Sequence, residues 1–192
     1  MLVRAFRTYR TKATATPELS PKVLTKLSSF VDVVKILRQQ QDRISDYTIV
    51  PTNFKVPNEA PWPESFRGKI LATTDIRKLH KNNQLPLEIE QELEKYKLVW
   101  DVNAYKWQMK IDALSVYKKL YGDTNVPYTF VCPENDPNWP KDTWNTPLGK
   151  QVSNILKEFH RSKKYKNQVL NKPTDRQLQL IELEFNWDFS GN

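Results

Sequence analysis

Apolar residues recur at helical spacing in three segments of the first half of the chain. A period of three to four residues places such side chains on one face of an α-helix. The pattern predicts helices from about residue 28 to 44, from 65 to 80, and from 87 onward, the last one after a proline that suits a first turn. Their apolar faces comprise Phe30, Val33, Val34, Leu37 and Ile44; then Phe66, Ile70, Leu71, Ile76 and Leu79; then Ile89, Leu93 and Tyr96.

The second half repeats this order of segments. Its first helix is expected to end at Gly122, because glycine suits a left-handed helix cap. Its second helix is expected to open near Thr146-Pro147. Its third is expected to open at Thr174, where Gln177 completes a capping box. The inward faces are predicted to comprise Trp107, Ile111, Leu114, Val116, Tyr117 and Leu120; then Leu148, Val152, Ile155, Leu156 and Phe159; then Leu178, Ile181 and Phe185.

A loop rich in proline and tryptophan follows the first helix of each half, and its two versions match. VPTNFKVPNEAPWPESFRGK at residues 50–69 corresponds to VPYTFVCPENDPNWPKDTWNTPLGK at residues 126–150. Val-Pro, Phe and Pro recur at a separation of 76 residues, Trp-Pro at 77 and Gly-Lys at 81. Such residues rarely recur in one order by chance, so the chain is predicted to contain an internal duplication. The predicted fold is all-α, with two tandem three-helix units, each with a long Pro/Trp-rich loop between its first and second helix.

Charge divides the chain into three predicted parts. The net charge is +8, but residues 1–29 hold six basic residues and one acid, residues 30–103 hold eleven of each, and residues 104–192 hold thirteen and ten. The three ranges are interpreted as a basic N-terminal segment, a first repeat and a second repeat. The first segment is basic, rich in hydroxyl groups and amphipathic, which is typical of a mitochondrial transit peptide, so a mitochondrial location is expected. A disordered basic arm is the alternative.

Several classes of function are not supported by the residues present. No apolar run is long enough to span a bilayer, and a single cysteine, Cys132, gives neither an intramolecular disulfide nor a cysteine-rich zinc site. Neither Gly-Lys pair has the upstream glycine and following hydroxyl residue of a phosphate-binding P-loop. His80 and His160 lack a second ligand at metal-site spacing and are interpreted as helix caps. We therefore expect no catalytic activity, no cofactor, no metal and no small-molecule substrate.

Two basic clusters are the candidate binding sites. Each cluster lies near the end of a predicted second helix, where cations also suit the negative end of the helix dipole. Clustered cations next to an aromatic residue are also typical of a surface that binds nucleic-acid phosphates. The candidate contacts are Lys150, Lys157, Arg161, Lys163, Lys164 and Lys166 in the second repeat, and Arg77, Lys78 and Lys81 in the first.

Three tryptophans of the loops, Trp62, Trp139 and Trp144, are candidates for stacking on bases. A base on an aromatic ring contributes about 1–3 kcal/mol. The alternative, which we favour, is that each Trp-Pro pair packs its loop onto the helices.

The second repeat resembles the helicase-associated domain repeat. The resemblance rests on Trp107 at the head of the first helix, Val-Pro at 126–127, FVCP at 130–133, WPKDTW at 139–144, LGKQVSNI at 148–155 and LIELEFNWD at 180–188. Residues 30–101 are similar to a more diverged copy, with Phe30 in the place of the tryptophan. The resemblance implies small all-α units that bind nucleic acid and have no enzymatic activity of their own, here without a helicase motor.

The function expected is therefore a non-catalytic module that contacts the RNA or DNA backbone through basic helix ends. The alternative is a structural or scaffolding module that binds another protein in an organellar complex. The two differ in their response to salt, because neutralising phosphates makes affinity fall steeply as salt rises.

Overall fold

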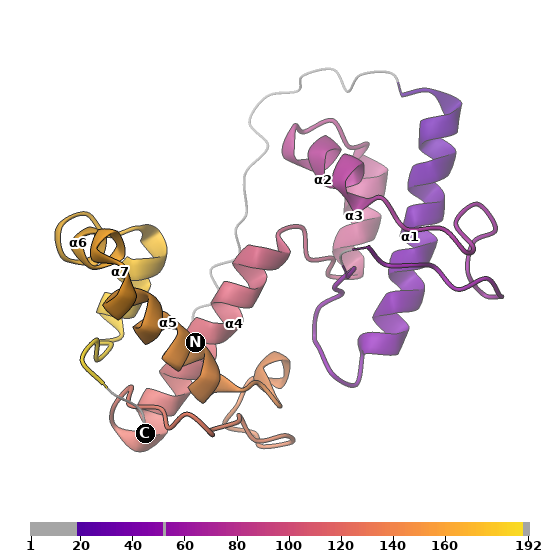
Figure 1. Ribbon diagram of the computed structural model, residues 1–192. Coiled ribbons are helices and arrows are strands. Elements are labelled where there is room, and N and C mark those ends of the chain that lie inside the picture. The colour runs from indigo at the N-terminus through magenta and orange to yellow at the C-terminus, as the bar shows by residue number, and fades with distance from the viewer. Residues whose placement is uncertain (1–18, 52, 190–192) are drawn as a thin grey trace. The chain divides into compact units, whose positions relative to one another are not determined.

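The computed structural model describes residues 19–51 and 53–189, and their regular secondary structure is helical. These residues form seven α-helices and one 3₁₀ helix, and they contain no β-strand, only two isolated bridges. The prediction of an all-α chain is confirmed. The elements in chain order (Figure 1) are α1 (Pro21–Gln41), α2 (Thr73–Lys81), α3 (Leu87–Lys95), α4 (Val102–Tyr121), η1 (Lys141–Thr143), α5 (Leu148–Arg161), α6 (Lys163–Asn171) and α7 (Asp175–Glu182).

Contacts divide the described residues into two compact units. The first unit comprises residues 19–40 and 48–98 and contains α1, α2 and α3. The second unit comprises residues 41–47 and 99–189 and contains η1 and α4 to α7, so it has four α-helices where three were predicted. We call residues 41–47 the strap, because they lie between two stretches of the first unit in the chain but belong to the second unit. The predicted transit peptide falls mostly on residues 1–18, outside the described residues.

The apolar face of α1 forms the core of the first unit. Leu27, Phe30 and Val34 are buried, as the periodicity predicts. The helix begins at Pro21, earlier than expected, because proline is tolerated in a first turn. It ends at Gln41, so Ile44 lies outside it and is 67% exposed, contrary to prediction.

The second helix of the first unit is shorter than predicted because its first part pairs with the preceding loop. The amide of Val56 donates to the carbonyl of Lys69 at 3.0 Å, and the amide of Gly68 donates to the carbonyl of Val56 at 2.9 Å. Gly68 has φ +67°, a left-handed conformation that glycine adopts without strain. Residues 64–68 therefore form turns, Ile70 pairs with Lys55 in an isolated bridge, and α2 begins only at Thr73.

The two Pro/Trp-rich loops have the same internal hydrogen bonds. In the second loop, Cys132 exchanges backbone bonds with Asn145 and Thr146 at 3.0 and 2.9 Å, as Val56 does with Gly68 and Lys69. Asn145 has φ +57°, like Gly68. The counterpart of Gly68 is thus Asn145, 77 residues later, whereas Gly149 lies inside α5. The predicted pairing of Gly68-Lys69 with Gly149-Lys150 is wrong.

The aromatic residues of the two loops pack in the same way. The ring of Phe54 lies 5.5 Å from that of Trp62, and the ring of Phe130 lies 5.7 Å from that of Trp139. Both tryptophans are buried, at 4% and 2% exposure. Each therefore fastens its loop to its own core, which is the alternative that the sequence favoured.

The core of the second unit lies among α4, α5, α7 and the loop. α4 contacts α5, α7 and η1, and α5 contacts α6. Gly122 caps α4 with φ +91°, and Thr174 and Gln177 form the capping box of α7, both as predicted. Leu178 and Ile181 are 42% and 41% exposed, however, so their predicted inward position is wrong, whereas Phe185 is buried as predicted. The buried residues of this core are Ile111, Ala113, Leu114, Tyr117, Val126, Cys132, Trp139, Leu148, Val152, Ile155, Leu156, Leu180 and Phe185.

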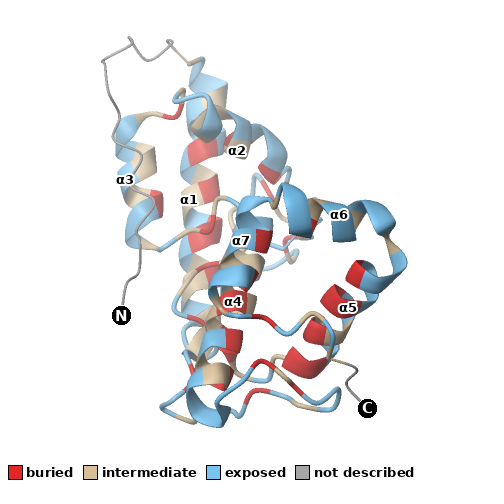
Figure 2. Cartoon of the chain, turned by 90° about the vertical axis from the view of Figure 1, so that its left-hand side faces the viewer, coloured by how far each residue is buried: buried red, intermediate tan, exposed pale blue. Residues whose placement is uncertain are grey.

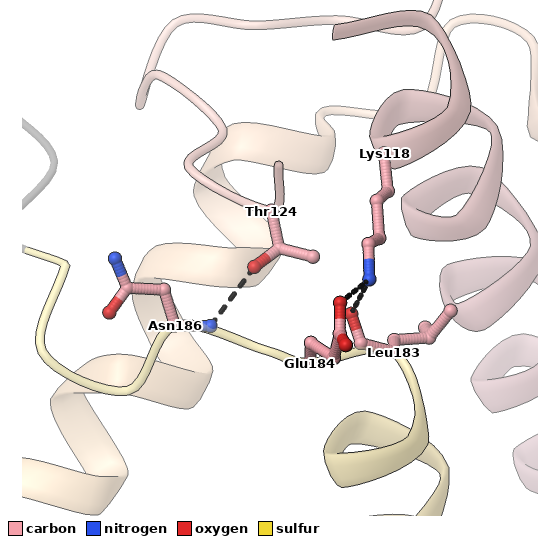
Figure 3. A network of polar contacts seen from close by, with 5 residues as sticks. All are labelled: Lys118, Thr124, Leu183, Glu184 and Asn186. Carbon is pink, nitrogen blue, oxygen red and sulfur yellow. Dashed lines mark hydrogen bonds and ion pairs between the residues drawn. The ribbon is translucent and has the colours of Figure 1, made fainter. Parts of the chain in front are cut away.

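A polar network joins the C-terminal ends of α4 and α7 (Figure 3). Lys118 donates to the carbonyl of Leu183 at 3.0 Å and pairs with the carboxylate of Glu184. The hydroxyl of Thr124, 2% exposed, accepts from the amide of Asn186 at 3.0 Å. The network fixes the start of the second loop, because Thr124 lies two residues before its Val-Pro pair.

Polar contacts fasten the strap to the second unit. The hydroxyl of Ser45 and the amide of Asp46 donate to one carboxylate oxygen of Asp142, the latter at 3.0 Å. The ring of Tyr47 packs edge-on against Tyr105 of α4 with centroids 5.5 Å apart. Directly after the strap the chain returns to the first unit, where the amide of Thr48 donates to the carbonyl of Lys97 at 3.0 Å.

Candidate nucleic-acid interface

α5 is amphipathic, with buried and exposed residues alternating along it (Figure 2), and its polar side carries a row of cations. The buried residues of the helix are Leu148, Gly149, Val152, Ile155, Leu156 and Phe159. Lys157 and Arg161 follow Lys150 by seven and eleven residues, so at 100° per residue both lie within about 20° of it around the helix. All three are exposed. We call Lys150, Lys157 and Arg161 the basic stripe; at 1.5 Å per residue it extends over roughly 16 Å.

Three further cations begin a helix that the sequence did not predict. Ser162 ends α5 and caps α6, since its hydroxyl accepts from the amide of Tyr165 at 3.0 Å. Lys163, Lys164 and Lys166 are exposed in the first turn of α6, which contains no acid. We call these three residues the lysine cluster. The capping serine was the available signal for α6, but the lysines after it were interpreted as a helix end.

This placement changes the electrostatic interpretation of the cluster. Cations at the C-terminal end of a helix are stabilised by its dipole, which accounts for Arg161 without a ligand. The lysine cluster lies instead at the positive N-terminal end of α6, where the dipole disfavours cations and favours anions. Residues 148–173 hold seven basic residues and a single acid, Glu158. The start of α6 is therefore a region of concentrated positive potential.

Within residues 19–51 and 53–189, no ion pair joins a cation of the stripe or the cluster to a carboxylate. The ion pairs in these ranges involve other cations, among them Lys26, Arg67, His80, Lys95 and Lys118. Two of the cations lie over aromatic rings instead: Lys157 is 5.6 Å from the ring centroid of Tyr128, and Lys166 is 5.5 Å from that of Phe159. The stripe and the cluster therefore remain available to an external anion.

The candidate phosphate-binding residues of the first unit, unlike those of the second, lie near an acidic helix. Lys78 and Lys81 are exposed at the end of α2, while Arg77 is half-buried. Nε2 of His80 lies 3.4 Å from the carboxylate of Glu90 on α3. Burial lowers the pKa of His80 although Glu90 opposes this shift. α3 carries four glutamates, at positions 88, 90, 92 and 94, so the acidic helix offsets the cations of α2.

The candidate stacking residues are mostly inaccessible. Trp62 and Trp139 are buried, so no base can lie on either ring in this structure. Trp144 is half-buried, and its indole nitrogen donates to the carbonyl of Trp139 at 3.1 Å. The stacking hypothesis therefore does not hold for Trp62 and Trp139. An exposed aromatic that the sequence analysis did not select, Tyr128, lies beside Lys157.

Other chemistry has little support in the described residues. Cys132 is 1% exposed, and burial raises the pKa of its thiol to about 12, so it remains protonated at neutral pH. Across residues 19–51 and 53–189, no three His, Cys, Asp or Glu side chains come together as a metal site would require. No helix within the same ranges has both the length and the apolar character needed to cross a membrane.

The second unit is thus a small helical domain with a basic helix face and a basic helix start. Residues 104–188 match the family model described as "Helicase associated domain". This match covers most of the second unit and less than half of the chain. Comparison with curated proteins and with solved structures gave no match.

Proposed function

We propose that the second unit is a non-catalytic module that binds the backbone of RNA or DNA along α5 and the start of α6. One observation carries the proposal. Six exposed cations lie along one helix and at the positive end of the next, and none of them pairs with a carboxylate in the part of the chain that the structure describes. Phosphates spaced along a strand suit such an array, because each contact releases a counterion from the nucleic acid. The match to the helicase-associated family supports the same class of ligand.

The test is a salt series of binding measurements with the full chain. We would measure fluorescence anisotropy of labelled single- and double-stranded RNA and DNA with wild type and with Lys157→Gln/Arg161→Gln/Lys164→Gln. The control is Lys55→Gln/Lys106→Gln/Lys119→Gln, which removes the same charge at exposed positions outside the stripe and cluster. The first variant should bind more weakly and reduce the slope of log K against log salt by about 2. Equal losses in the two variants would refute a defined interface.

A protein-binding scaffold is the second candidate, and one surface favours it. Leu120, Tyr121 and Val131 are 44%, 57% and 48% exposed around the end of α4 and the second loop. The ring of Tyr121 also contacts Phe130 at 5.9 Å, which connects this surface to the loop. An apolar interface responds little to salt, so binding that is insensitive to salt would favour this alternative.

We also infer that the two units are tandem copies of one domain and that the protein acts in mitochondria. The matching hydrogen bonds of the two loops support the inference of tandem copies. The ends of α3 and α7 support it too, because the amides of Leu98 and Phe185 donate to the carbonyls of Leu93 and Leu180 at 3.2 and 3.0 Å.

The basic composition of the N-terminal segment supports the inference of a mitochondrial location. Fusion of residues 1–29 to a fluorescent reporter tests it, and a reporter that stays outside mitochondria would refute it.

A further inference from the structure

Tyr128 lies against the first turn of α5 because Gly149 has no side chain. A Cβ atom on Gly149 would come within 1.9 Å of the carbonyl oxygen of Pro127 and 2.6 Å of that of Tyr128. The amide of Gly149 also donates to the carbonyl of Phe130 at 3.1 Å. The backbone of the loop at Pro127 and Tyr128 therefore passes in close contact with α5 at Gly149, and Tyr128 is one of the two residues at this contact.

The ring of Tyr128 lies beside the basic stripe. Its centroid is 5.6 Å from Nζ of Lys157, eight residues after Gly149 and therefore about 12 Å further along the helix. Helical side chains point toward the N-terminus, so Lys157 reaches back toward the crossing to meet the ring. The ring thus lies on the N-terminal side of Lys157, along the part of α5 that begins at Lys150.

Tyr128 remains accessible in spite of this contact. It is 45% exposed, whereas Trp62 and Trp139 are buried. The other strongly exposed aromatic in the described part of the chain, Tyr121, packs on Tyr117 and Phe130, and its ring contacts include no cation of the stripe. An open ring among cations that suit phosphates is the arrangement that binds single strands: the cations follow the backbone while the ring stacks on a base.

We propose that Tyr128 is a stacking platform for one base of a single-stranded RNA or DNA whose phosphates follow the basic stripe. The proposal rests on the proposed function and specifies its ligand as single-stranded. In a duplex the bases stack on each other and are not free to lie on a protein ring, so a duplex would use the cations alone. Selectivity for single strands would come from the ring, and salt-dependent affinity from the stripe.

The test measures binding of the full chain to three labelled ligands of equal length. These are a pyrimidine single strand, the same strand with abasic sites at its central positions, and the corresponding duplex. The protein variants are Tyr128→Ala, Tyr128→Leu and Tyr128→Phe. A fourth is Lys157→Gln/Arg161→Gln/Lys164→Gln, which removes two cations of the stripe and one of the lysine cluster and is called the stripe variant. Tyr121→Ala is the control for removing an exposed tyrosine of the same unit. Circular dichroism melts check that each variant is folded.

The ring predicts a distinctive pattern of affinities. Tyr128→Ala and Tyr128→Leu should weaken binding of the single strand by roughly 5- to 150-fold, the effect of losing one stacked base. Tyr128→Phe should bind within about twofold of wild type, because it keeps the ring. Binding of the abasic strand and of the duplex should not change in any Tyr128 variant, and Tyr121→Ala should bind like wild type.

The outcomes separate this inference from the proposed function. If the stripe variant loses affinity while Tyr128→Ala does not, Tyr128 is not a platform and the backbone-binding function stands. Equal losses for Tyr128→Ala on all three ligands would show that it supports Lys157 or the fold, which also overturns the stacking role. If wild type binds none of the ligands, or the stripe variant binds like wild type, the proposed function fails and the platform fails with it.

Discussion

Replacing Gly149 by alanine tests the crossing of the second loop over α5. The new Cβ would lie 1.9 Å from the oxygen of Pro127, and 2.6 and 2.7 Å from the oxygen and carbon of Tyr128. Ordinary van der Waals contacts of a Cβ lie between 3.4 and 4 Å, so the loop or the helix must move by more than 1 Å. Because backbone atoms cannot rotate away as a side chain can, this overpacking should cost about 1–3 kcal/mol or more.

Two further effects accompany the clash. Alanine is a better helix former than glycine by about 1 kcal/mol, which offsets part of the cost. A displaced loop loses the bond from Gly149 to Phe130, worth about 1 kcal/mol. We therefore expect Gly149→Ala to lower the free energy of unfolding of the second unit by about 1–3 kcal/mol.

The assay is urea unfolding followed by tryptophan fluorescence. Five of the six tryptophans lie in the second unit, so the signal reports mainly on it. Gly122→Ala is the matched control: its Cβ would have no neighbour within 4 Å, but φ is +91°. It should cost about 1–2 kcal/mol through backbone strain alone. A Gly149→Ala protein as stable as wild type, or more stable, would refute the close crossing.

Three further predictions concern the remaining features. The pKa of His80 is lowered in the folded protein, so its imidazole binds a proton more readily in the unfolded chain, and the stability of the first unit should fall as pH drops below the ordinary value of 6.5. Urea unfolding midpoints measured from pH 5 to 8 should show this fall, and the midpoints of His80→Gln should depend less on pH. Cys132 should resist iodoacetamide in the native protein and react only in denaturant, as mass spectrometry can follow, because its thiol is buried and protonated. Ser45→Ala should destabilise the second unit by about 1–3 kcal/mol in urea unfolding, since it removes a hydrogen bond to the Asp142 carboxylate; unchanged stability would show that the strap contributes nothing through this contact.

The sequence predicted the parts of the fold that local rules determine. Helical periodicity located α4 and α5, and the rules for capping identified Gly122 and Thr174. α2 was misplaced because the pairing of Val56 with Gly68 and Lys69 is a tertiary contact that no period reveals. The buried face of α7 was predicted wrongly because the apolar residues of this helix occur on more than one face. Only packing against the rest of the unit decides that Leu180 is buried and Leu178 is exposed.

The candidate site was predicted in composition but not in geometry. The cations were found from their density in the sequence, whereas their alignment on α5 follows from the helix bounds. The lysine cluster was assigned to a helix end because Ser162 was not recognised as the start of α6. Trp62 and Trp139 were selected as platforms for their ring size, but the loop bonds bury them. Tyr128 lacked a signal, since its importance depends on the crossing at Gly149.

The strap couples the folding of the second unit to that of the first. Residues 48–98 separate the strap from the rest of the second unit, so folding of the second unit closes a chain segment of 51 residues. Closing a flexible loop of that length costs on the order of 3 kcal/mol in chain entropy. The folded first unit lowers this cost, because Thr48 pairs with Leu98 in a bridge and holds the two exits of the loop together. A mutation in the core of the first unit should therefore also weaken the second. A fragment restricted to residues 104–188 would lose both the strap and this coupling.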